Sequence, residues 1–272
     1  MRNLTKTGAR INSRVGKAIH DYKLIEDGDN ILIAVSGGKD SLTLLTLLKN
    51  IQSWAPVKFT LTAAHIVSDL QPADEGHLAF LKKTFDDLGV DGRFRNISIA
   101  DGDEKISCFW CSWNRRKALF QLADEIGCNK VALGHHKDDI VETMLMNLVY
   151  NGEISGMNPR QELFEGKITI IRPLAYVEEK MTRAFAKESG FDGYTCTCTY
   201  VDDSKRKFIK GFIREADKSV RGTDIKTNIF RSMSRIKKEY LDIADHAVKT
   251  KMRRCCEPSG AHLAGGRLGR AP

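Results

Sequence analysis

The sequence predicts an α/β fold in which helices cover both faces of a parallel, doubly wound sheet. Strand and helix signals alternate from residue 30 to residue 189, as in repeated βα units. The expected strands are short, continuous apolar runs, which is typical of strands buried on both faces. Two of these runs lead through polar, glycine-containing turns into helices. Because ligands of such sheets bind at the carboxyl ends of the strands, both turns are candidate functional segments.

Each element is expected from its apolar spacing. The spacing of Leu4, Ile11, Val15 and Ile19 predicts an N-terminal helix, and the leucine-rich segment 40–51 predicts a helix after the first strand. We expect strands at 30–35, 59–67, 93–99, 130–133 and 168–171, and further helices at 76–88, 115–126, 140–150 and 177–189. The crossovers should be right-handed.

The chain is expected to divide into three regions. Residues 1–200 form a nucleotide-binding α/β domain with the N-terminal helix, and 201–250 form a basic helical region. Residues 251–272, rich in Gly, Ala and Arg without periodicity, are expected to be disordered.

The charge balance points to a polyanionic partner. The 272 residues carry a formal net charge of +8, and basic residues crowd the second half of the chain. The alternative is that these are solvated faces of helices. No apolar stretch approaches the roughly 20 residues that span a bilayer, and the N-terminus has no apolar signal region. We therefore expect a cytoplasmic protein with no membrane partner.

The turn after the first expected strand has the composition of a phosphate site. Two glycines permit a sharp turn, and the following helix N-terminus offers backbone amides to an anion. Lys39 adds a positive charge, and the spacing differs from that of a Walker A loop. The alternative is an ordinary turn with Asp40 or Ser41 as N-cap. The candidate nucleotide-binding residues are Ala34, Val35, Ser36, Gly37, Gly38, Lys39, Asp40 and Ser41.

A second turn, Gly134 to Asp139, should face the first across the carboxyl edge of the sheet. A carboxylate of Asp138 or Asp139 could hold Mg²⁺ against phosphate oxygens. The alternative is helix capping by either aspartate, with Glu142 completing a capping box. His65 ends the second strand near the same edge, where it could contact a nucleotide or be a buried core histidine.

Two cysteine pairs indicate a metal site. Cys108 and Cys111 precede a helix expected near Ser112, and both the helix N-terminus and Arg115 favour thiolates. Cys196 and Cys198 form the second pair, and two separated pairs favour iron–sulfur or zinc over a redox disulfide or structural cysteines. Trp110 and Trp113 beside the first pair could stack on a base or form an apolar shell.

Five segments in this order (SGGKDS, CFWCSWNRR, LGHHKDDIVETMLMN, RPLAY and the late cysteine pair) resemble the tRNA 2-thiocytidine synthetase family of PP-loop ATP pyrophosphatases. The resemblance covers residues 11–240. It implies that ATP and Mg²⁺ adenylate the C2 oxygen of a tRNA cytidine, that pyrophosphate leaves, and that sulfur then replaces the oxygen with loss of AMP. Lys39, Asp40, Asp138 and Asp139 would act near the phosphates, and Arg115 near the phosphates or the base.

The resemblance also implies a [4Fe–4S] cluster held by Cys108, Cys111 and one of Cys196 or Cys198, with one iron open. The late pair here is C-x-C where the family has C-x-x-C, so the third ligand and the choice between cluster and Zn²⁺ stay open. The implied partners are tRNA and a sulfur donor such as a cysteine desulfurase persulfide or sulfide, and the protein could form a homodimer. The alternatives are a non-thiolating PP-loop ligase and a non-enzymatic, metal-bearing RNA-binding protein.

Overall fold

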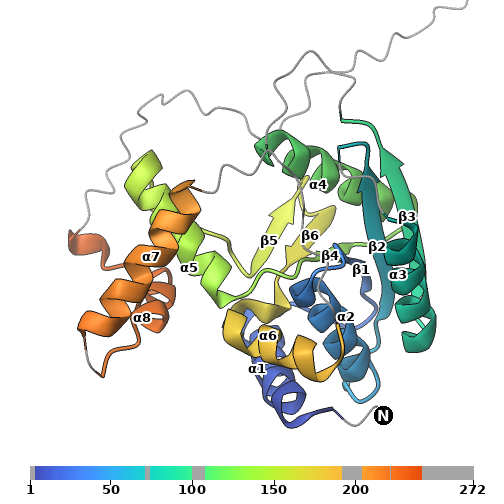
Figure 1. Cartoon of the computed structure of the whole chain (residues 1–272), viewed down its shortest axis with the longest axis horizontal. Helices are drawn as coiled ribbons and strands as arrows, with labels where there is room; N and C mark the ends of the chain where they lie inside the picture. Colours follow the sequence, from blue (N-terminus) through green and yellow to red (C-terminus); the bar gives the residue numbers. More distant parts are fainter. Residues whose placement is uncertain (1–3, 71–73, 100–107, 192–203, 221, 241–272) are drawn as a thin grey trace, which may run out of the picture. The chain divides into compact units, whose positions relative to one another are not determined.

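The computed structural model describes residues 4–70, 74–99, 108–191, 204–220 and 222–240 (Figure 1). The chain divides into two compact units, Met1–Ser234 and Arg235–Pro272. The sheet and the long helices belong to the first unit. In the second unit, the described part contains a short 3₁₀ turn, Lys238–Tyr240. The tail expected to be disordered, 251–272, lies outside the described residues.

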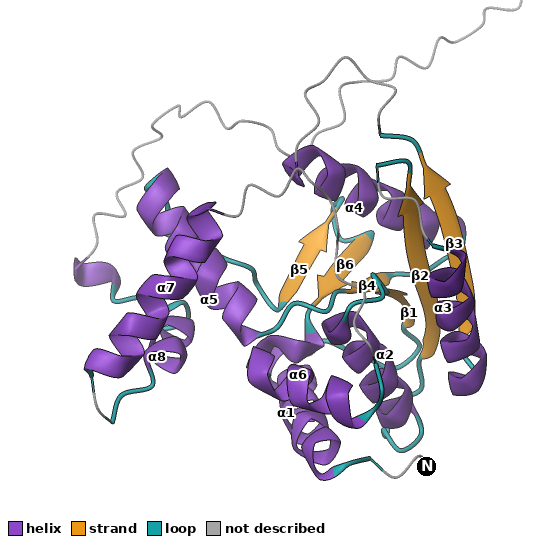
Figure 2. Ribbon diagram, viewed as in Figure 1, coloured by secondary structure: helices purple, strands orange, loops and turns teal. Residues whose placement is uncertain are grey.

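The first unit is built on a six-stranded sheet, which confirms the predicted doubly wound α/β class (Figure 2). The strand order is β3-β2-β1-β4-β6-β5, and every neighbouring pair is parallel except β5–β6. The strands are β1 Asn30–Ala34, β2 Thr60–Ser68, β3 Asp91–Ile97, β4 Lys130–Ala132, β5 Arg160–Leu163 and β6 Ile168–Ile171.

Strand β5 was not predicted from the sequence, and it adds an antiparallel edge to the otherwise parallel sheet. Its sequence, RQEL, is polar and not buried, so it gave no apolar signal. It pairs antiparallel with β6 at the sheet edge through a tight turn in which Phe164 and Glu165 adopt left-handed backbone angles. An edge strand can be polar in this way because it packs on fewer neighbours.

Helices pack on both faces of the sheet. Ile31 and Ile33 of β1 pack with α1 Lys6–Tyr22, α2 Lys39–Gln52, α3 Glu75–Leu88 and α6 Glu179–Glu188. Leu32 and Val131 face the opposite way and pack with α4 Cys108–Glu125. The alternation of buried side chains along β1 therefore separates the two layers.

A third apolar cluster joins the C-terminal helices to the sheet domain. Ile140 and Val141 of α5 (Lys137–Met146) pack with Ile209 and Ile213 of α7 (Ser204–Ser219) and with Phe230 of α8 (Ile225–Ser232). A π-helical turn, Asn147–Asn151, extends α5, and a 3₁₀ turn, Pro173–Tyr176, follows β6. Within the described residues of the basic region, 204–220 and 222–240, the main elements are helices α7 and α8, as expected. Over the described ranges, no helix combines the length and apolarity that crossing a membrane requires.

The functional edge of the sheet lies where its winding reverses. The central neighbours β1 and β4 are parallel, and the chain proceeds from β1 towards β2 but from β4 towards β6. The chain therefore leaves β1 and β4 in opposite directions along the sheet, and ligands of open α/β sheets bind at the carboxyl ends of strands at such a switch point. The two glycine-containing turns occupy this position.

Candidate functional site

The turn after β1 presents a helix N-terminus without a side-chain cap. Gly38 is the N-cap of α2 in an extended conformation, and Gly37 has φ of 85°, a region that favours glycine. Asp40 and Ser41 lie inside the first turn of α2 and are not its N-cap, so the capping alternative was wrong here. Ser41 Oγ donates to the carbonyl oxygen of Gly38 at 2.9 Å. Because no side chain caps α2, its first backbone amides are available to bind an anion.

His65 of β2 is hydrogen-bonded to the backbone at the start of this turn. Its Nδ1–H donates to the carbonyl oxygen of Val35 at 2.7 Å, and the backbone N–H of Val35 donates to Ala64 O at 2.8 Å. Burial lowers the pKa of His65 to about 4, so the ring is neutral at pH 7. The side chain is thus a buried histidine that holds the start of the turn. A direct nucleotide contact by His65 stays a prediction.

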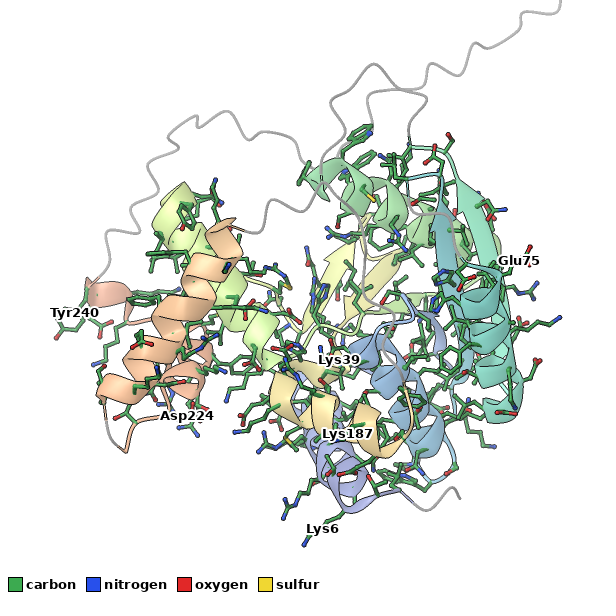
Figure 3. All side chains as sticks on the ribbon, in the orientation of Figure 1. Lys6, Lys39, Glu75, Lys187, Asp224 and Tyr240 are labelled. Carbon is green, nitrogen blue, oxygen red and sulfur yellow. The ribbon has the colours of Figure 1, made fainter. Side chains whose placement is uncertain are left out.

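Lys39 lies between two carboxylates. Its position is labelled in Figure 3. Its Nζ is 2.8 Å from Asp40 Oδ2 and 3.3 Å from Glu179 Oε1 of α6. Burial alone lowers the pKa of Lys39, but the hydrogen bond with Asp40 and the charge of Glu179 outweigh burial and raise it. Thr182 Oγ1 donates to the other oxygen of Asp40 at 2.5 Å. Lys39 is therefore fully charged, and residues of α2 and α6 orient it. We call the turn that carries it, residues 35–41, the phosphate turn.

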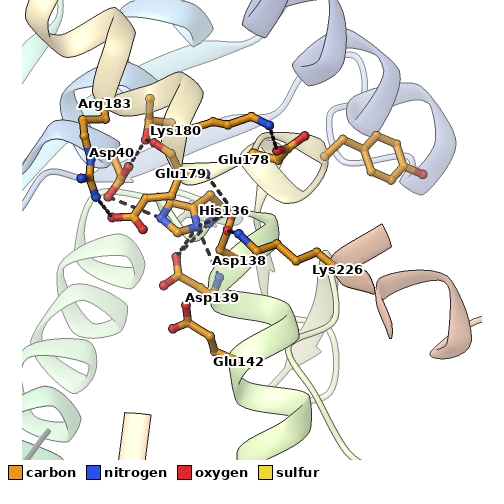
Figure 4. Close-up of polar contacts among 12 residues, drawn as sticks. Asp40, His136, Asp138, Asp139, Glu142, Glu178, Glu179, Lys180, Arg183 and Lys226 are labelled. Carbon is orange, nitrogen blue, oxygen red and sulfur yellow. Dashed lines mark hydrogen bonds and ion pairs between the residues drawn. The ribbon is translucent and has the colours of Figure 1, made fainter. Parts of the chain in front are cut away.

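The second turn approaches the first closely, as predicted. A Cβ added at Gly134 would lie 3.1 Å from the backbone nitrogen of Ser41, so a side chain there would displace the start of α2. His136 Nε2 is 3.8 Å from Asp40 Oδ2 (Figure 4). The turns after β1 and β4 thus lie against each other, and a side chain at position 134 would require one of them to shift.

Asp138 and Asp139 hold this second turn in place. The backbone N–H of His136 donates to Asp139 Oδ2 at 3.0 Å, and His136 Nδ1 accepts from the Asp139 N–H, so these two residues form the capping box of α5. Asp138 accepts from the Glu179 N–H at 2.8 Å and from Lys226 Nζ at 2.6 Å. Capping was expected, but His136 is the N-cap and Asp139, not Glu142, completes the box.

Glu142 is a functional candidate, although the sequence analysis considers it only as part of a capping box. Its side chain is buried, with Lys210 Nζ at 3.8 Å and Arg206 Nε at 4.0 Å, and Oε2 has no hydrogen-bond partner among the described residues. Burial raises the pKa of Glu142 from 4.5 to about 7. The positive charge of Lys210 acts to lower this pKa, and the negative charge of Asp139 acts to raise it.

Replacing Glu142 with glutamine is expected to stabilise the protein at pH 8 but not at pH 5. An acid whose pKa is raised on folding loses stability as pH rises above its unfolded value of 4.5, and the loss is complete above about 7. The shift corresponds to at most about 3 kcal/mol. Urea unfolding of both proteins at the two pH values measures the difference. The exposed Glu162→Gln variant is the control, and equal effects of E142Q at both pH values would contradict the pKa shift.

Part of the cysteine site is described. Cys108 begins α4, so the C-x-x-C segment forms the first turn of the helix. The expectation that this segment precedes a helix starting near Ser112 was wrong. Cys111 is half-buried, whereas the Cys108 side chain and the whole of Cys196 and Cys198 lie outside the described residues. Within the described ranges, no three His, Cys, Asp or Glu side chains form a group that could hold a metal ion.

Aromatic and basic residues of α4 lie close to Cys111 in the sequence. The rings of Trp110 and Trp113 stack on each other, with centroids 5.4 Å apart and an interplanar angle of 4°. Arg115 donates to the carbonyl oxygen of Ile66 near the carboxyl end of β2 at 3.0 Å. Arg115 is therefore anchored at the functional edge of the sheet, although its predicted contact with phosphate or base is not shown.

Several residues near the site are not among the candidate site residues of the sequence analysis, although His135 and Arg172 lie in segments that it names. The His77 ring covers Gly37, where an added Cβ would overlap it. Burial and the charge of Arg172 lower the pKa of His135 to about 4, while burial and the nearby Arg116 lower the pKa of Arg172 to about 10. Glu179 could have been noticed, because an acidic pair follows the RPLAY segment at a helix start.

This site, at the switch point of a doubly wound sheet, defines a nucleotide-binding protein of the PP-loop class. The PP-loop domain model matches residues 8–216. The chain is 39% identical to a tRNA-cytidine(32) 2-sulfurtransferase of Delftia acidovorans, over 86% of this chain and 76% of the relative. It is 37% identical to the protein of that name from Pectobacterium carotovorum, over 90% and 79%. The chain therefore belongs to the PP-loop family of tRNA-cytidine(32) 2-sulfurtransferases.

A solved structure supports the fold independently. The U34-tRNA thiolase NcsA from Methanococcus maripaludis, determined with its [4Fe-4S] cluster, superposes with a TM-score of 0.67 at 21% identity. The match covers 86% of this chain and 79% of that one. At this identity the likeness establishes the arrangement of strands and helices.

Proposed function

We propose that this protein is an ATP-dependent tRNA sulfurtransferase that adenylates the C2 oxygen of a cytidine and replaces it with sulfur. The observation that carries this is the joined pair of turns after β1 and β4, built around Lys39 and Gly134. Family membership supports tRNA as the substrate and cytidine as its reactive nucleoside.

The chain's own residues account for the nucleotide step. The first amides of α2 and the charge of Lys39 would bind the phosphates of ATP and stabilise charge that develops on them. Mg²⁺ that accompanies a nucleotide needs only one or two protein carboxylates, and we assign Asp40 to this role. The cytidine C2 oxygen attacks the α-phosphorus, the bond to the bridging oxygen breaks, and pyrophosphate leaves.

Adenylation changes what the second step requires. A ring carbonyl oxygen is a poor leaving group, whereas the adenylated oxygen departs with AMP when sulfur attacks C2. Asp138 and Asp139 act as positioning residues, because their hydrogen bonds fix the second turn against the first. Correct positioning of the two reactants supplies much of the acceleration in such a step.

The donor set of α4 fits a soft metal site. Cys108 and Cys111 are three residues apart in the first helical turn, where residues share one face and thiolates are favoured. We propose that they and one of Cys196 or Cys198 hold a [4Fe–4S] cluster, as present in the NcsA thiolase, with Zn²⁺ as the alternative metal. A bound cluster with one open iron would supply a site for the incoming sulfur.

We further propose that sulfur comes from a cysteine desulfurase persulfide or from sulfide, and that the reaction takes place in the cytoplasm. Homodimer formation is a separate proposal. Gel filtration with light scattering tests it, and a monomer at micromolar concentration would reject it.

The test of the function is tRNA-dependent turnover. Anaerobically purified protein with ATP, Mg²⁺, sulfide and unmodified tRNA is expected to release pyrophosphate and AMP and to form 2-thiocytidine, detected by mass spectrometry of nucleosides. Pyrophosphate release with no thiolated product would instead indicate a non-thiolating ligase. No turnover despite tRNA binding would indicate an RNA-binding protein.

A further inference from the structure

A charged cleft lies among α5, α6, α7 and α8 of the first unit. Its volume is about 330 Å³, and its lining is charged except for Ile213. Beside its cations the lining carries the carboxylates of Asp138, Glu142, Glu179 and Asp217, and because charged groups away from bulk water need charged or polar partners, the cleft suits a charged ligand. The cations that line it are Lys210, Arg214 and Lys218 of α7 and Lys226 of α8.

The cations of α7 form one continuous row. Arg206, Lys210, Arg214 and Lys218 follow one another at intervals of four residues, so they share one face of the helix. At 1.5 Å per residue the row is about 18 Å long, a length along which a nucleic-acid strand carries several phosphates. The side chains of Lys210 and Lys218 are 44% and 65% exposed, so they are accessible to such a strand.

Glu142 leaves Arg206 and Lys210 of this row incompletely paired, whereas Lys218 is paired with Glu215 at 2.9 Å. Glu142 is separated from Lys210 by 3.8 Å and from Arg206 by 4.0 Å, longer than hydrogen bonds, and its Oε2 has no hydrogen-bond partner in the described parts of the chain. A phosphate could accept hydrogen bonds from both cations, and a protonated Glu142 could donate one to a phosphate oxygen.

The cleft also adjoins the nucleotide site. Glu179 lines the cleft and lies 3.3 Å from Lys39 of the phosphate turn. We propose that the cleft and the cationic row of α7 bind the phosphate backbone of the tRNA strand that carries the target nucleoside. This inference rests on the proposed function, because it names where that reaction's RNA substrate is held.

The test reverses two charges inside the cleft and two outside it. The full-length K210E/R214E variant is compared with K205E/K207E, whose lysines lie on the same helix but do not line the cleft. Affinity for unmodified tRNA is measured from 50 to 400 mM KCl. We expect K210E/R214E to weaken binding at least about 30-fold at low salt and to reduce the salt slope by about two, with a several-fold smaller effect of the control.

Equal weakening by both pairs would show that only net charge matters and would overturn the inference, as would normal binding by K210E/R214E. ATP binding without RNA serves as the folding control. If the wild-type protein thiolates tRNA while K210E/R214E binds it normally, the inference fails and the proposed function stands. If tRNA binds through the cleft but the wild-type protein shows no turnover, the inference stands and the proposed function fails.

The E142Q variant tests the same site through the pH dependence of tRNA binding. Facing Glu142 are Arg206 and Lys210 of α7 and Asp138 and Asp139 of α5, while Glu179 and Lys226 line the cleft from α6 and α8. Arg214, Asp217 and Lys218 of α7 line the same cleft. Because an anion favours the neutral acid, wild-type affinity for tRNA should fall several-fold from pH 6 to pH 8. E142Q should show a flat profile over this range and tighter binding at pH 8. Parallel profiles for the two proteins would contradict the proposed contact.

Discussion

Replacement of Lys39 by alanine is expected to lower tRNA-dependent pyrophosphate release at least about 100-fold, the usual effect of removing a group that stabilises transition-state charge. Lys39 is the cation that the phosphate turn itself supplies, and Asp40 and Glu179 orient its ammonium group. K39R should retain part of the activity, because it keeps the charge but changes the geometry of its donors. Release of pyrophosphate is followed at saturating ATP and tRNA.

The control for K39A is Lys49→Ala, which removes a lysine from the last turn of the same helix. Lys49 donates to Gln52 and to Gly89 O, away from the site. K49A should turn over at a rate within about twofold of wild type, in keeping with the small effect of a surface substitution. A K39A variant that keeps half of the wild-type rate while K49A is unaffected would reject the assignment of Lys39.

Replacement of Cys111 by serine is expected to remove most of the bound iron and to reduce thiolation to background. A hydroxyl is a harder and more weakly bound ligand than a thiolate, and loss of one ligand leaves the C-x-x-C turn with a single sulfur. Iron and sulfide are determined together with visible absorption after anaerobic purification. ATP binding should be unchanged, because the phosphate turn belongs to other elements.

Cys128 provides the matched control. It is buried in the connection between α4 and β4, and burial raises the pKa of its thiol, as is typical of a packing residue. C128A should keep its iron and its activity and lose only about 1 kcal/mol of stability. Full iron content and thiolation in C111S would exclude this cysteine as a ligand. Zinc in place of iron in the colourless wild-type protein would favour the alternative metal.

The elements that could be predicted from the sequence are those whose side chains have one dominant environment. The NILIAV run is apolar and its residues 31–33 are buried in the sheet, so β1 and the turn that follows it could be predicted. Strand β5 was missed because an edge strand with the sequence RQEL has no apolar pattern. The start of α4 was placed too late because the CFWCSW segment has no clear amphipathic spacing.

The contacts that complete the site join residues far apart in the sequence. Asp138 caps the start of α6 at Glu179, and Thr182 donates to Asp40. Periodicity predicts which face of a helix is buried but not which partner it meets, so neither contact could be predicted. The facing of the two turns was predictable, because it follows from strand order alone.

The two hydrogen bonds that Asp138 accepts restrict the movement of neighbouring helices. One buried carboxylate ties the start of α6 and Lys226 of α8 to α5, and α6 in turn contacts the lysine of the phosphate turn. Neither α6 nor α8 can tilt away without breaking a charged hydrogen bond. The scaffold is thereby braced before any substrate arrives, so an incoming nucleoside meets a frame already aligned and the binding energy need not be used to assemble it.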